Sequence, residues 1–332
     1  MSRNWVIALL LLLLTTIVIT GCGSEEDEDL SNQAIKLSMH LWPGYAHSYI
    51  AQEKGFFADE GVDVELRLIE KIPDNIANFV NGRADMAFGL QSDAMLLAAL
   101  GFEVKIIYIA DFSNGGDVIV SSQSIESVAG LKGMTVSVDS LNSFNHIFLV
   151  NLLEKNGLQE SDITIVPIPA SEVPDALDAG TIDAGQTWNP YFSTALARGY
   201  RELATTKDAY GIVTDVLMVR TDTLNKRPDD VEKVLRALFK ALKFRETDEL
   251  AAYTIMSEAF LMPVGELRET IGGNIFPDLQ ENKRAFEDTG ESTSLFASGR
   301  FISDFFLKKG IVHEPVDLEL LHAPEIIQGI EP

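Results

Sequence analysis

Short apolar runs of two kinds follow one another along most of the chain, and their spacing predicts alternating strands and helices. Strands are expected where apolar residues alternate with polar ones or run on continuously, at residues 35–41, 62–69, 84–90, 104–110, 134–138, 163–168 and 183–187. Helices are expected between them, at residues 46–57, 74–81, 92–100, 143–156, 171–179 and 190–198. This alternation is typical of an α/β fold with largely parallel sheets.

The alternation comes as two series, residues 35–110 and 134–198, and each is long enough to form a small sheet of its own. Two further strand-like pieces, residues 118–122 and 213–220, stand on either side of the second series. They are the only candidates placed to carry the chain out to a second unit and back. The sequence therefore predicts two hinge crossovers.

The chain after residue 220 is mostly helical. Over residues 228–245 the apolar positions recur at steps of three and four, which predicts a helix with one buried stripe: Val231, Val234, Leu235, Leu238, Phe239 and Leu242. Further helices are expected at residues 249–259, 264–271, 279–288 and 295–309.

The first residues have the pattern of a bacterial lipoprotein signal. Arg3 precedes an apolar run over residues 5–14 that continues through residues 17–19 and stops at Gly21-Cys22. The run is too short and ends too abruptly for a spanning helix. Because Cys22 is the only cysteine, it is better explained as a lipid attachment site than as a redox or metal residue. We expect a signal over residues 1–21 and an acidic, flexible tether over residues 22–33.

Composition narrows the class of protein. The chain has 332 residues, 46% of them hydrophobic, enough for two domains of ordinary size once a leader is removed. It has 26 Lys and Arg against 50 Asp and Glu, a net charge of -24. Such a charge repels nucleic acid and anionic lipid heads, so we expect no nucleic-acid partner and a membrane contact through the lipid alone.

Sequence signatures of catalysis are scarce. The chain has no Gly-x-Ser-x-Gly elbow, no phosphate-binding Gly-x-x-x-x-Gly-Lys-Ser/Thr loop and no His-Glu-x-x-His pair. Its five histidines are scattered and have no cysteine partners beside them. We therefore expect no enzyme activity, no cofactor and no metal site.

Aromatic and polar side chains gather where the predicted strands end, which is where open α/β sheets place their ligands. Trp42 and Tyr45 follow the first strand across a Pro-Gly turn. The third strand leads into Gln91 and Ser92, of which Ser92 is a candidate N-cap whose helix start suits a polar or anionic group.

The later strands continue this pattern. Asn114 and Asp117 follow the fourth strand, just before the first crossover, whereas Ser143 starts a helix and Trp188 ends a strand in the second series. Both series thus offer groups to one cleft. A tryptophan face suits a planar ring or a cation, and Asp117 favours a positive or donor-rich partner.

Each of these candidates also has a structural explanation. Trp42 and Trp188 could be core anchors, because large aromatic residues are usually mostly buried. Ser92 and Ser143 could be helix caps only, and Asn114 with the two glycines after it could be a turn only. The functional interpretation depends on their joint placement at strand ends in both series.

Several segments carry a family likeness: Trp-Pro-Gly-Tyr at residues 42–45 with residues 49–57 and 60–66, Asn-Gly-Arg-Ala-Asp-Met-Ala-Phe at residues 81–88, Ser-Asn-Gly-Gly-Asp at residues 113–117, and residues 131–136 and 179–184. Together they resemble the ABC transporter substrate-binding proteins of the taurine, nitrate, sulfonate and thiamine-pyrimidine-precursor group. The resemblance spans nearly all of the mature chain. It is specific for the family and poorly specific for the ligand.

The resemblance implies a two-lobed periplasmic-binding-protein fold of type II, in which each lobe is a mainly parallel sheet flanked by helices. We expect residues 34–118 and 217–332 to form lobe I and residues 119–216 to form lobe II. Such a protein closes on a small molecule and delivers it to an ABC permease and its ATPase, at the cell envelope outside the cytoplasm. We expect a lipid-anchored monomer.

Position within the family assigns a set of residues to the cleft: Trp42, Tyr45, Gln91, Asn114, Asp117, Ser143 and Trp188, with Asp215 at the return hinge. One relative of the same fold is an enzyme that makes the thiamine pyrimidine with a cysteine-rich segment, which this chain lacks. A sensor that presents its ligand to a membrane receptor is an alternative that the sequence leaves open.

The ligand is not decided by the sequence. A sulfonate or nitrate would need Arg or Lys in the cleft, and none of the chosen positions is basic, so the helix starts at Ser92 and Ser143 would have to bind it. The aromatic and acidic set favours a neutral or cationic ring compound, such as a pyrimidine precursor of thiamine.

Overall fold

The computed structural model describes residues 33–331, and the chain from Ala34 onward forms one compact unit. The predicted signal, Cys22 and all but the last residue of the predicted tether lie outside the described residues. No helix within residues 33–331 is both long and apolar enough to cross a membrane.

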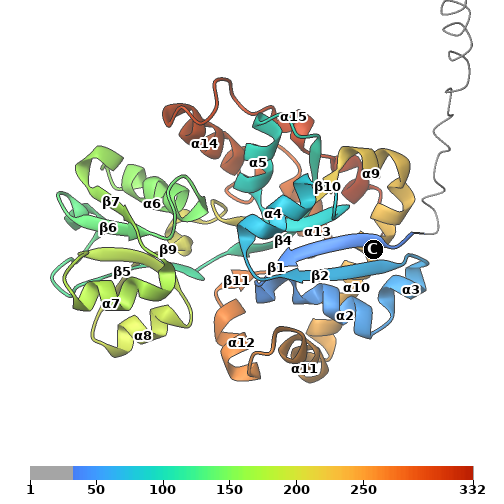
Figure 1. The fold of residues 1–332 in the computed structure, drawn as a ribbon, viewed down its shortest axis with the longest axis horizontal. Helices are drawn as coiled ribbons and strands as arrows, with labels where there is room; N and C mark the ends of the chain where they lie inside the picture. Colours follow the sequence, from blue (N-terminus) through green and yellow to red (C-terminus); the bar gives the residue numbers. More distant parts are fainter. Residues whose placement is uncertain (1–32, 332) are drawn as a thin grey trace, which may run out of the picture. The chain divides into compact units, whose positions relative to one another are not determined.

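The first sheet has six strands in the order β11-β4-β10-β3-β1-β2 (Figure 1). Their bounds are Ile35–His40 (β1), Val64–Ile69 (β2), Met86–Leu90 (β3), Val104–Ser113 (β4), Thr214–Arg220 (β10) and Asn274–Ile275 (β11). Strand β1 runs parallel to β2 and β3, whereas β10 lies antiparallel between β3 and β4. The carboxyl ends of β1, β2 and β3 therefore meet at one edge, where β10 begins.

The second sheet has five strands in the order β7-β6-β8-β5-β9. Their bounds are Asp117–Ser121 (β5), Thr135–Val138 (β6), Thr164–Pro167 (β7), Ala184–Trp188 (β8) and Arg201–Thr205 (β9). Strand β6 runs parallel to β7 and β8, and β5 runs antiparallel to β8 and β9.

The α/β fold class is confirmed, and both sheets are mixed. Strands β1 to β4 run in one direction against β10 and β11, and β6 to β9 run in one direction against β5. The physical reason is the path of the chain between the sheets. Strands β5 and β10 each enter a sheet directly from the other one, through residues 114–116 and through the segment after β9. Each arrives at the edge where the parallel strands end and so runs against them. The two pieces that were expected to be crossovers are thus strands inside the sheets.

Helices cover both sheets. Around the six-stranded sheet they are α2 (His47–Glu53), α3 (Phe56–Glu60), α4 (Ile72–Val80), α5 (Gln91–Ala99), α9 (Thr221–Lys226), α10 (Pro228–Thr247), α11 (Glu249–Phe260), α12 (Val264–Ile271), α13 (Leu279–Ala285), α14 (Leu295–Lys308), α15 (Leu318–Leu321) and α16 (Pro324–Gln328). The five-stranded sheet carries α6 (Phe144–Lys155) on one face, and α7 (Val173–Asp178) and α8 (Tyr191–Ala197) on the other (Figure 1).

The helical predictions hold with one clear exception. The predicted apolar stripe of α10 is buried at Val231, Val234, Leu235, Leu238 and Leu242, and it packs against α2 and α3. The helix expected over residues 46–57 is instead a short 3-10 helix η2 (Pro43–Ala46) followed by α2 and α3. Gly55 separates the last two because its φ of 74° is left-handed, a conformation that glycine adopts without steric cost.

Candidate functional site

A cavity of about 240 Å³ lies between the two sheets, at the edge where the parallel strands of each sheet end. Its lining residues are His40, Leu41, Trp42, Glu70, Ile72, Leu90, Gly116, Asp117, Asp139, Phe144, Trp188, Val213, Asp215 and Asn274. They come from both sheets and from both passages of the chain between them. This is the placement expected for a ligand site in an open α/β fold. We call it the cleft cavity.

The structure divides the nine residues that were predicted to bind the ligand. Four of them line the cleft cavity: Trp42, Asp117, Trp188 and Asp215. The other five are not among its lining residues: Tyr45, Gln91, Ser92, Asn114 and Ser143. A direct role in ligand binding stays a prediction for the first group.

The five outside the lining have other contacts or positions. Gln91 donates to the Leu295 carbonyl and accepts from Ser298, so it joins α5 to α14. Ser92 lies inside α5, whose N-cap is Leu90. The prediction of Ser92 as an N-cap is therefore wrong, because the observed N-cap lies two residues earlier in the chain.

Asn114 and Ser143 also hold local structure. The Asn114 backbone N–H donates to the Gly273 carbonyl at 2.7 Å. Ser143 is the N-cap of α6, but its hydroxyl donates to the Ser140 carbonyl at 2.7 Å and makes no capping bond.

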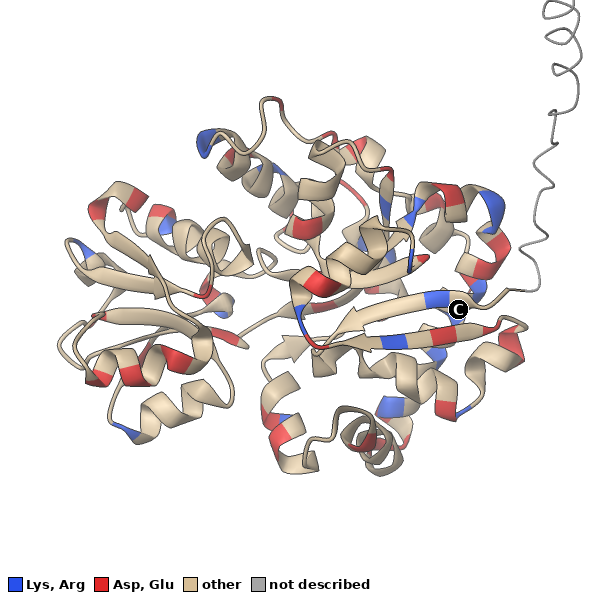
Figure 2. Cartoon of the chain, viewed as in Figure 1, with Lys and Arg blue, Asp and Glu red and all other residues tan. Residues whose placement is uncertain are grey.

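The charge of the cleft cavity has one sign. Glu70, Asp117, Asp139 and Asp215 contribute carboxylates to its lining, whereas no Lys or Arg of the described chain is among the lining residues. Acidic residues are spread over both sheets and their helices (Figure 2). A site of this charge attracts cations and hydrogen-bond donors and repels anions.

A buried carboxylate orients one of the two tryptophans. Asp111 on β4 is fully buried and accepts a hydrogen bond from Trp42 Nε1 at 3.1 Å and from Asn274 Nδ2 at 2.5 Å. Burial raises the pKa of Asp111 to about 6, although these two hydrogen bonds act to lower it. The Trp42 ring is thus held at the cavity wall by a group that does not itself line the cavity.

Asp215, at the start of β10, is held in a similar way. The Tyr45 hydroxyl donates a hydrogen bond to Asp215 Oδ1, and the Tyr45 ring stacks on Phe88 with centroids 4.6 Å apart. Burial, and next the charge of Asp111, raise the pKa of Asp215 well above its ordinary value. Tyr45, although outside the lining, therefore positions the carboxylate that faces the cavity.

Asp117, the first residue of β5, ties the crossing segment to the second sheet. Its carboxylate accepts from Ser113 Oγ at 2.7 Å and from Gln186 Nε2 at 3.0 Å. Burial raises its pKa to about 6 against the effect of these bonds. In the ladder it pairs with Trp188, so a carboxylate and an aromatic ring stand side by side at the cavity.

His40 ends β1, lines the cavity and is only 7% exposed. Burial lowers its pKa to about 4, so the ring is neutral at pH 7. Its Nδ1 is buried and has no hydrogen-bond partner in the described chain. A neutral imidazole offers one donor and one acceptor to a ligand.

Some lining residues that were not predicted from the sequence also follow the ends of strands, where open α/β sheets place their ligands. Glu70 follows β2, Asp139 follows β6, and Phe144 starts the helix after it. Applying the rule to every predicted strand would have found all three. Asn274 gave no such signal, because β11 has only two residues and no apolar pattern.

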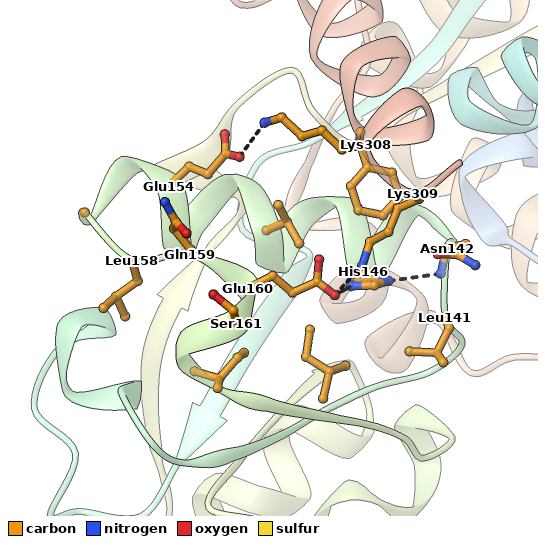
Figure 3. Close-up of a pocket in the computed structure, with 15 residues that line it drawn as sticks. Leu141, Asn142, His146, Glu154, Leu158, Gln159, Glu160, Ser161, Lys308 and Lys309 are labelled. Atoms are coloured by element: carbon orange, nitrogen blue, oxygen red, sulfur yellow. Dashed lines mark hydrogen bonds and ion pairs between the residues drawn. The ribbon is translucent and has the colours of Figure 1, made fainter. Parts of the chain in front are cut away.

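A second, larger cavity lies outside the cleft, between α6 and the end of α14 (Figure 3). It measures about 1030 Å³, and we call it the α6–α14 cavity. Lys308 contacts Glu154 at 2.9 Å, while Lys309 and His146 both contact Glu160. Its charged side chains thus neutralise one another, unlike the carboxylates of the cleft cavity. For this reason we take the smaller cavity as the candidate site.

Comparison with known sequences gives a family match over most of the described chain. The profile of the family described as NMT1/THI5 like matches residues 42–247. A putative aliphatic sulfonates-binding protein of Bacillus subtilis (strain 168) is 25% identical over 245 residues, 72% of this chain and 74% of that protein. A 4-amino-5-hydroxymethyl-2-methylpyrimidine phosphate synthase of Aspergillus parasiticus is 26% identical over 231 residues, 64% of this chain and 66% of that enzyme.

Comparison with solved structures concerns the fold. The periplasmic aliphatic sulphonate binding protein SsuA of Escherichia coli superposes with a TM-score of 0.71 at 16% identity, covering 87% of this chain and 91% of that one. The periplasmic nitrate-binding protein NrtA of Synechocystis PCC 6803 gives a TM-score of 0.64 at 15% identity, covering 89% and 87%. These matches confirm the predicted periplasmic-binding-protein fold.

Proposed function

The chain belongs to the NMT1/THI5-like family, and we propose that it is a solute-binding protein that captures a small molecule in the cleft cavity and delivers it to an ABC permease. The observation that carries the proposal is the composition of that cavity. Trp42, which follows β1, and Trp188, which ends β8, bring one tryptophan from the side of each sheet. Four acidic residues line the space between them, without a Lys or Arg of the described chain. Unpaired charge and aromatic surface at the ends of strands are what a ligand would complete.

The ligand that fits this lining is a small ring compound that is cationic or rich in N–H donors. A tryptophan face attracts a cation, and a carboxylate accepts hydrogen bonds from it. A volume of about 240 Å³ suits a molecule of one ring. A pyrimidine of the kind handled by the fungal synthases meets these requirements better than a sulfonate does, although a related bacterial protein is named for sulfonates.

The same lining opposes an anionic ligand. A sulfonate would meet the carboxylates of Glu70, Asp117 and Asp139. Ser92 and Ser143, which were considered as anion sites, are not among the lining residues, although Leu90 and Phe144 at the same two helix starts are. The cost of desolvating an anion among carboxylates is large unless a cation accompanies it.

We propose binding and delivery, with no chemical reaction, as the task of the site. The enzymatic alternative would need the cysteine-rich segment of the thiamine-pyrimidine enzyme, and the only cysteine of this chain is Cys22. A sensor that presents the ligand to a membrane receptor is the second candidate for the partner. Growth on the ligand as a nutrient, lost when an adjacent permease is deleted, would favour transport.

We further propose that the protein works at the cell envelope, outside the cytoplasm, attached by a lipid on Cys22. The N-terminal sequence pattern supports both the location and the lipid. The similar structures named as periplasmic proteins support the location. Mass spectrometry of the mature protein should find a diacylglyceryl group on its first residue, and Cys22→Ala should release the protein from the membrane fraction. A membrane-bound Cys22→Ala variant would contradict the proposal.

Two lobes that close on the ligand are part of the same proposal, with residues 34–118 and 217–332 in lobe I and residues 119–216 in lobe II. Ligand binding should then reduce the radius of gyration in small-angle X-ray scattering, because hinge closure makes a two-lobed protein more compact. An unchanged radius at saturating ligand would argue against closure.

A thermal-shift screen tests the ligand class. Because a ligand that binds only the native state raises the unfolding midpoint by mass action, unlabelled compounds of different classes can be ranked on one scale. Pyrimidines, cyclic amines and quaternary ammonium compounds should raise the midpoint, whereas taurine, benzenesulfonate and nitrate should not. A response to the anions alone would overturn the proposed ligand class.

A further inference from the structure

Two buried carboxylates face each other at the floor of the cleft. Asp111 on β4 and Asp215 on β10 are directly paired in the antiparallel ladder, which places their Cβ atoms about 5 Å apart. Asp111 is fully buried, and Asp215 is 6% exposed. Two ionised carboxylates this close repel strongly away from water, so the pair favours keeping one proton.

The hydrogen bonds show which of the two carboxylates keeps the proton. Asp111 accepts one hydrogen bond on each oxygen, from Trp42 and from Asn274, as an ionised carboxylate does. Asp215 accepts one bond, from Tyr45 on Oδ1, and its Oδ2 has no hydrogen-bond partner among the described residues. Since Asp215 also lines the cavity, its Oδ2 is the atom that can carry a proton and later meet a ligand.

The other charged groups around the pair do not supply a cation to Asp215. Asp93 on α5 and Asp117 on β5 add to the negative charge that acts on it. Arg245 on α10 acts on Asp111, but its guanidinium stacks on the Phe276 ring at 3.9 Å. Burial lowers the pKa of both His47 on α2 and His40 on β1, so these rings stay neutral.

His40 supplies an independent sign that a ligand belongs here. Its side chain lines the same cavity, is only 7% exposed, and makes no hydrogen bond in the described chain. The ring lies edge-on to Tyr45, with centroids 5.0 Å apart, and so stands next to the bond between Tyr45 and Asp215. A buried imidazole without a partner is costly unless a ligand group completes it.

We propose that the ligand is a cation whose positive group takes the place of a proton on Asp215, so that each ligand bound expels one proton from the cleft. The inference rests on the proposed function, since it needs a ligand in this cavity. The proton leaves the Asp215 carboxyl for bulk water, and the carboxylate then pairs with the ligand. His40 hydrogen-bonds a polar group on the same ligand.

This exchange gives binding a definite pH dependence. Where the free protein holds the proton and the complex does not, affinity for a permanent cation rises by about tenfold for each unit of pH. A neutral ligand that binds beside the protonated carboxyl shows no such slope. The exchange therefore distinguishes cationic from neutral ligands of the same shape.

The experiment uses 1-methylnicotinamide, a permanent ring cation, with nicotinamide and benzenesulfonate as neutral and anionic rings. Isothermal titration in buffers of different ionisation enthalpy counts the protons released. Infrared difference spectra, taken without any ligand, detect a neutral carboxyl at pH 7 directly. We expect a neutral-carboxyl band in the parent protein, its loss in Asp215→Asn, and release of about one proton per 1-methylnicotinamide bound.

The variants make the test specific. Asp215→Asn keeps an acceptor for the Tyr45 hydroxyl, and it should bind 1-methylnicotinamide more weakly, with no proton release and a flat pH dependence. Asp93→Asn changes another buried carboxyl, one that does not line the cavity and accepts a bond from the Leu90 N–H at 3.2 Å. It should leave the proton count unchanged, and circular dichroism checks that both variants fold.

The outcomes separate the two proposals. A missing neutral-carboxyl band, no binding of 1-methylnicotinamide, or binding of it without proton release overturns the exchange, whichever compounds the thermal screen finds. If benzenesulfonate alone binds and the neutral-carboxyl band is still present, the proposed ligand class is wrong, but the assignment of a proton to Asp215 stands.

Discussion

The two cavities of this protein differ in how their charges are satisfied. In the α6–α14 cavity every lysine stands against a glutamate, and His146 donates to Glu160, which Lys309 also contacts. In the cleft cavity Asp117 and Asp215 have hydroxyl and amide donors, but no Lys or Arg of the described chain is in the lining. The charges of the α6–α14 cavity are paired within the protein, whereas the carboxylates of the cleft cavity have no positive side chain beside them in the lining that the described residues form. Volume alone would have selected the α6–α14 cavity.

Helix α6 and the segment before it line both cavities, and the other lining residues come from different elements. Helix α6 begins at the cleft cavity with Phe144 and runs along the α6–α14 cavity with His146 and Glu154. A binding site is marked by groups that the fold holds in place without pairing them. Substitutions at or near one cavity, with controls at the other cavity or at a distant position, test this contrast.

The largest effect should come from the aromatic wall of the cleft. Trp188→Ala should weaken binding of a cationic ring compound such as 1-methylnicotinamide by about tenfold to a hundredfold, because a desolvated cation–π contact and its buried area are lost. Lys308→Met, at the α6–α14 cavity, should leave the affinity unchanged. Calorimetric titration of both variants measures this.

Trp42→Ala extends the same test. It removes a ring and also leaves Asp111 without its indole donor, so its effect on affinity should be at least as large as that of Trp188→Ala. Trp42→Phe keeps a ring but loses the donor and should fall between. If neither alanine variant binds more weakly, the aromatic platform is assigned wrongly.

The passage of the chain between the sheets should be the next most sensitive feature. A Cβ on Gly273 would lie 2.5 Å from Gly116 N and 2.6 Å from its Cα, and backbone cannot move aside as a side chain can. Gly273→Ala should therefore lower the free energy of unfolding by about 2 kcal/mol or more. Urea unfolding of the purified variant gives this value.

Gly265 provides the matched control. It lies in α12, and a Cβ there would meet nothing within 4 Å. Gly265→Ala should be neutral or stabilise the protein by up to about 1 kcal/mol through helix propensity. Equal losses in the two variants would mean that the close approach at Gly273 carries no special cost.

The sequence predicted the elements of the fold well and their pairing less well. Periodicity located nine of the strands to within a few residues, from β1 to β10 apart from β9, because each is an apolar run or alternates apolar with polar residues. It missed β9 (Arg201–Thr205) and β11, which are polar or very short. The antiparallel entry of β5 and β10 is a property of the chain path, which local patterns do not record.

The candidate site was predicted only in part, because local sequence patterns do not show which residues the chain path brings together. Trp42, Asp117 and Trp188 were found because residues that follow strands share an edge. Asp111, inside β4, is one polar residue in an apolar strand, and only the ladder shows that it faces Asp215. The pairing of charges in the α6–α14 cavity joins residues about 150 positions apart, a separation that no local pattern spans.

A smaller effect is expected when the charge of Asp111 is removed from the unliganded protein. Its pKa is raised by burial from 3.8 to about 6, so between these pH values the native state binds more protons than the unfolded state. The free energy of unfolding then falls as the pH rises through this window. Asp111→Asn lacks this loss, and its stability relative to the parent should grow by about 1–3 kcal/mol from pH 4 to pH 7.

Asparagine fits this position. Its side-chain oxygen can accept the hydrogen bond from the Trp42 indole. Its NH₂ group can donate to Asn274 Oδ1 once the Asn274 side-chain amide flips, because that oxygen has no partner in the described chain. Asp288→Asn serves as the opposite control, because Arg300 lowers the pKa of the exposed Asp288. Its relative stability should fall with rising pH. Urea unfolding at several pH values would refute the assignment if both variants changed in the same direction.

The smallest effect tests the pairing in the α6–α14 cavity. His146 Nδ1 accepts from the Asn142 backbone N–H at 3.0 Å, so the proton of the neutral ring is on Nε2, which donates to Glu160 at 3.2 Å. The pKa of His146 is lowered first by burial, is raised by Glu160 and is lowered again by Lys309. Lys309→Met removes one lowering influence and leaves Glu160 facing His146 alone, so the His146 pKa should rise.

Lys308→Met is the matched control, because Lys308 lies at the same helix end but pairs with Glu154, and the side chains of this pair are 65% and 39% exposed. It should leave the His146 pKa unchanged and alter stability by less than about 0.5 kcal/mol. NMR titration of the His146 ring protons measures the pKa in each variant. A native pKa below the unfolded value costs stability as the pH falls, so Lys309→Met should lose less stability than the parent between pH 7 and pH 5. Equal His146 pKa values in the two lysine variants would mean that the charges of this cavity act independently, and its contrast with the cleft would then lie in composition alone.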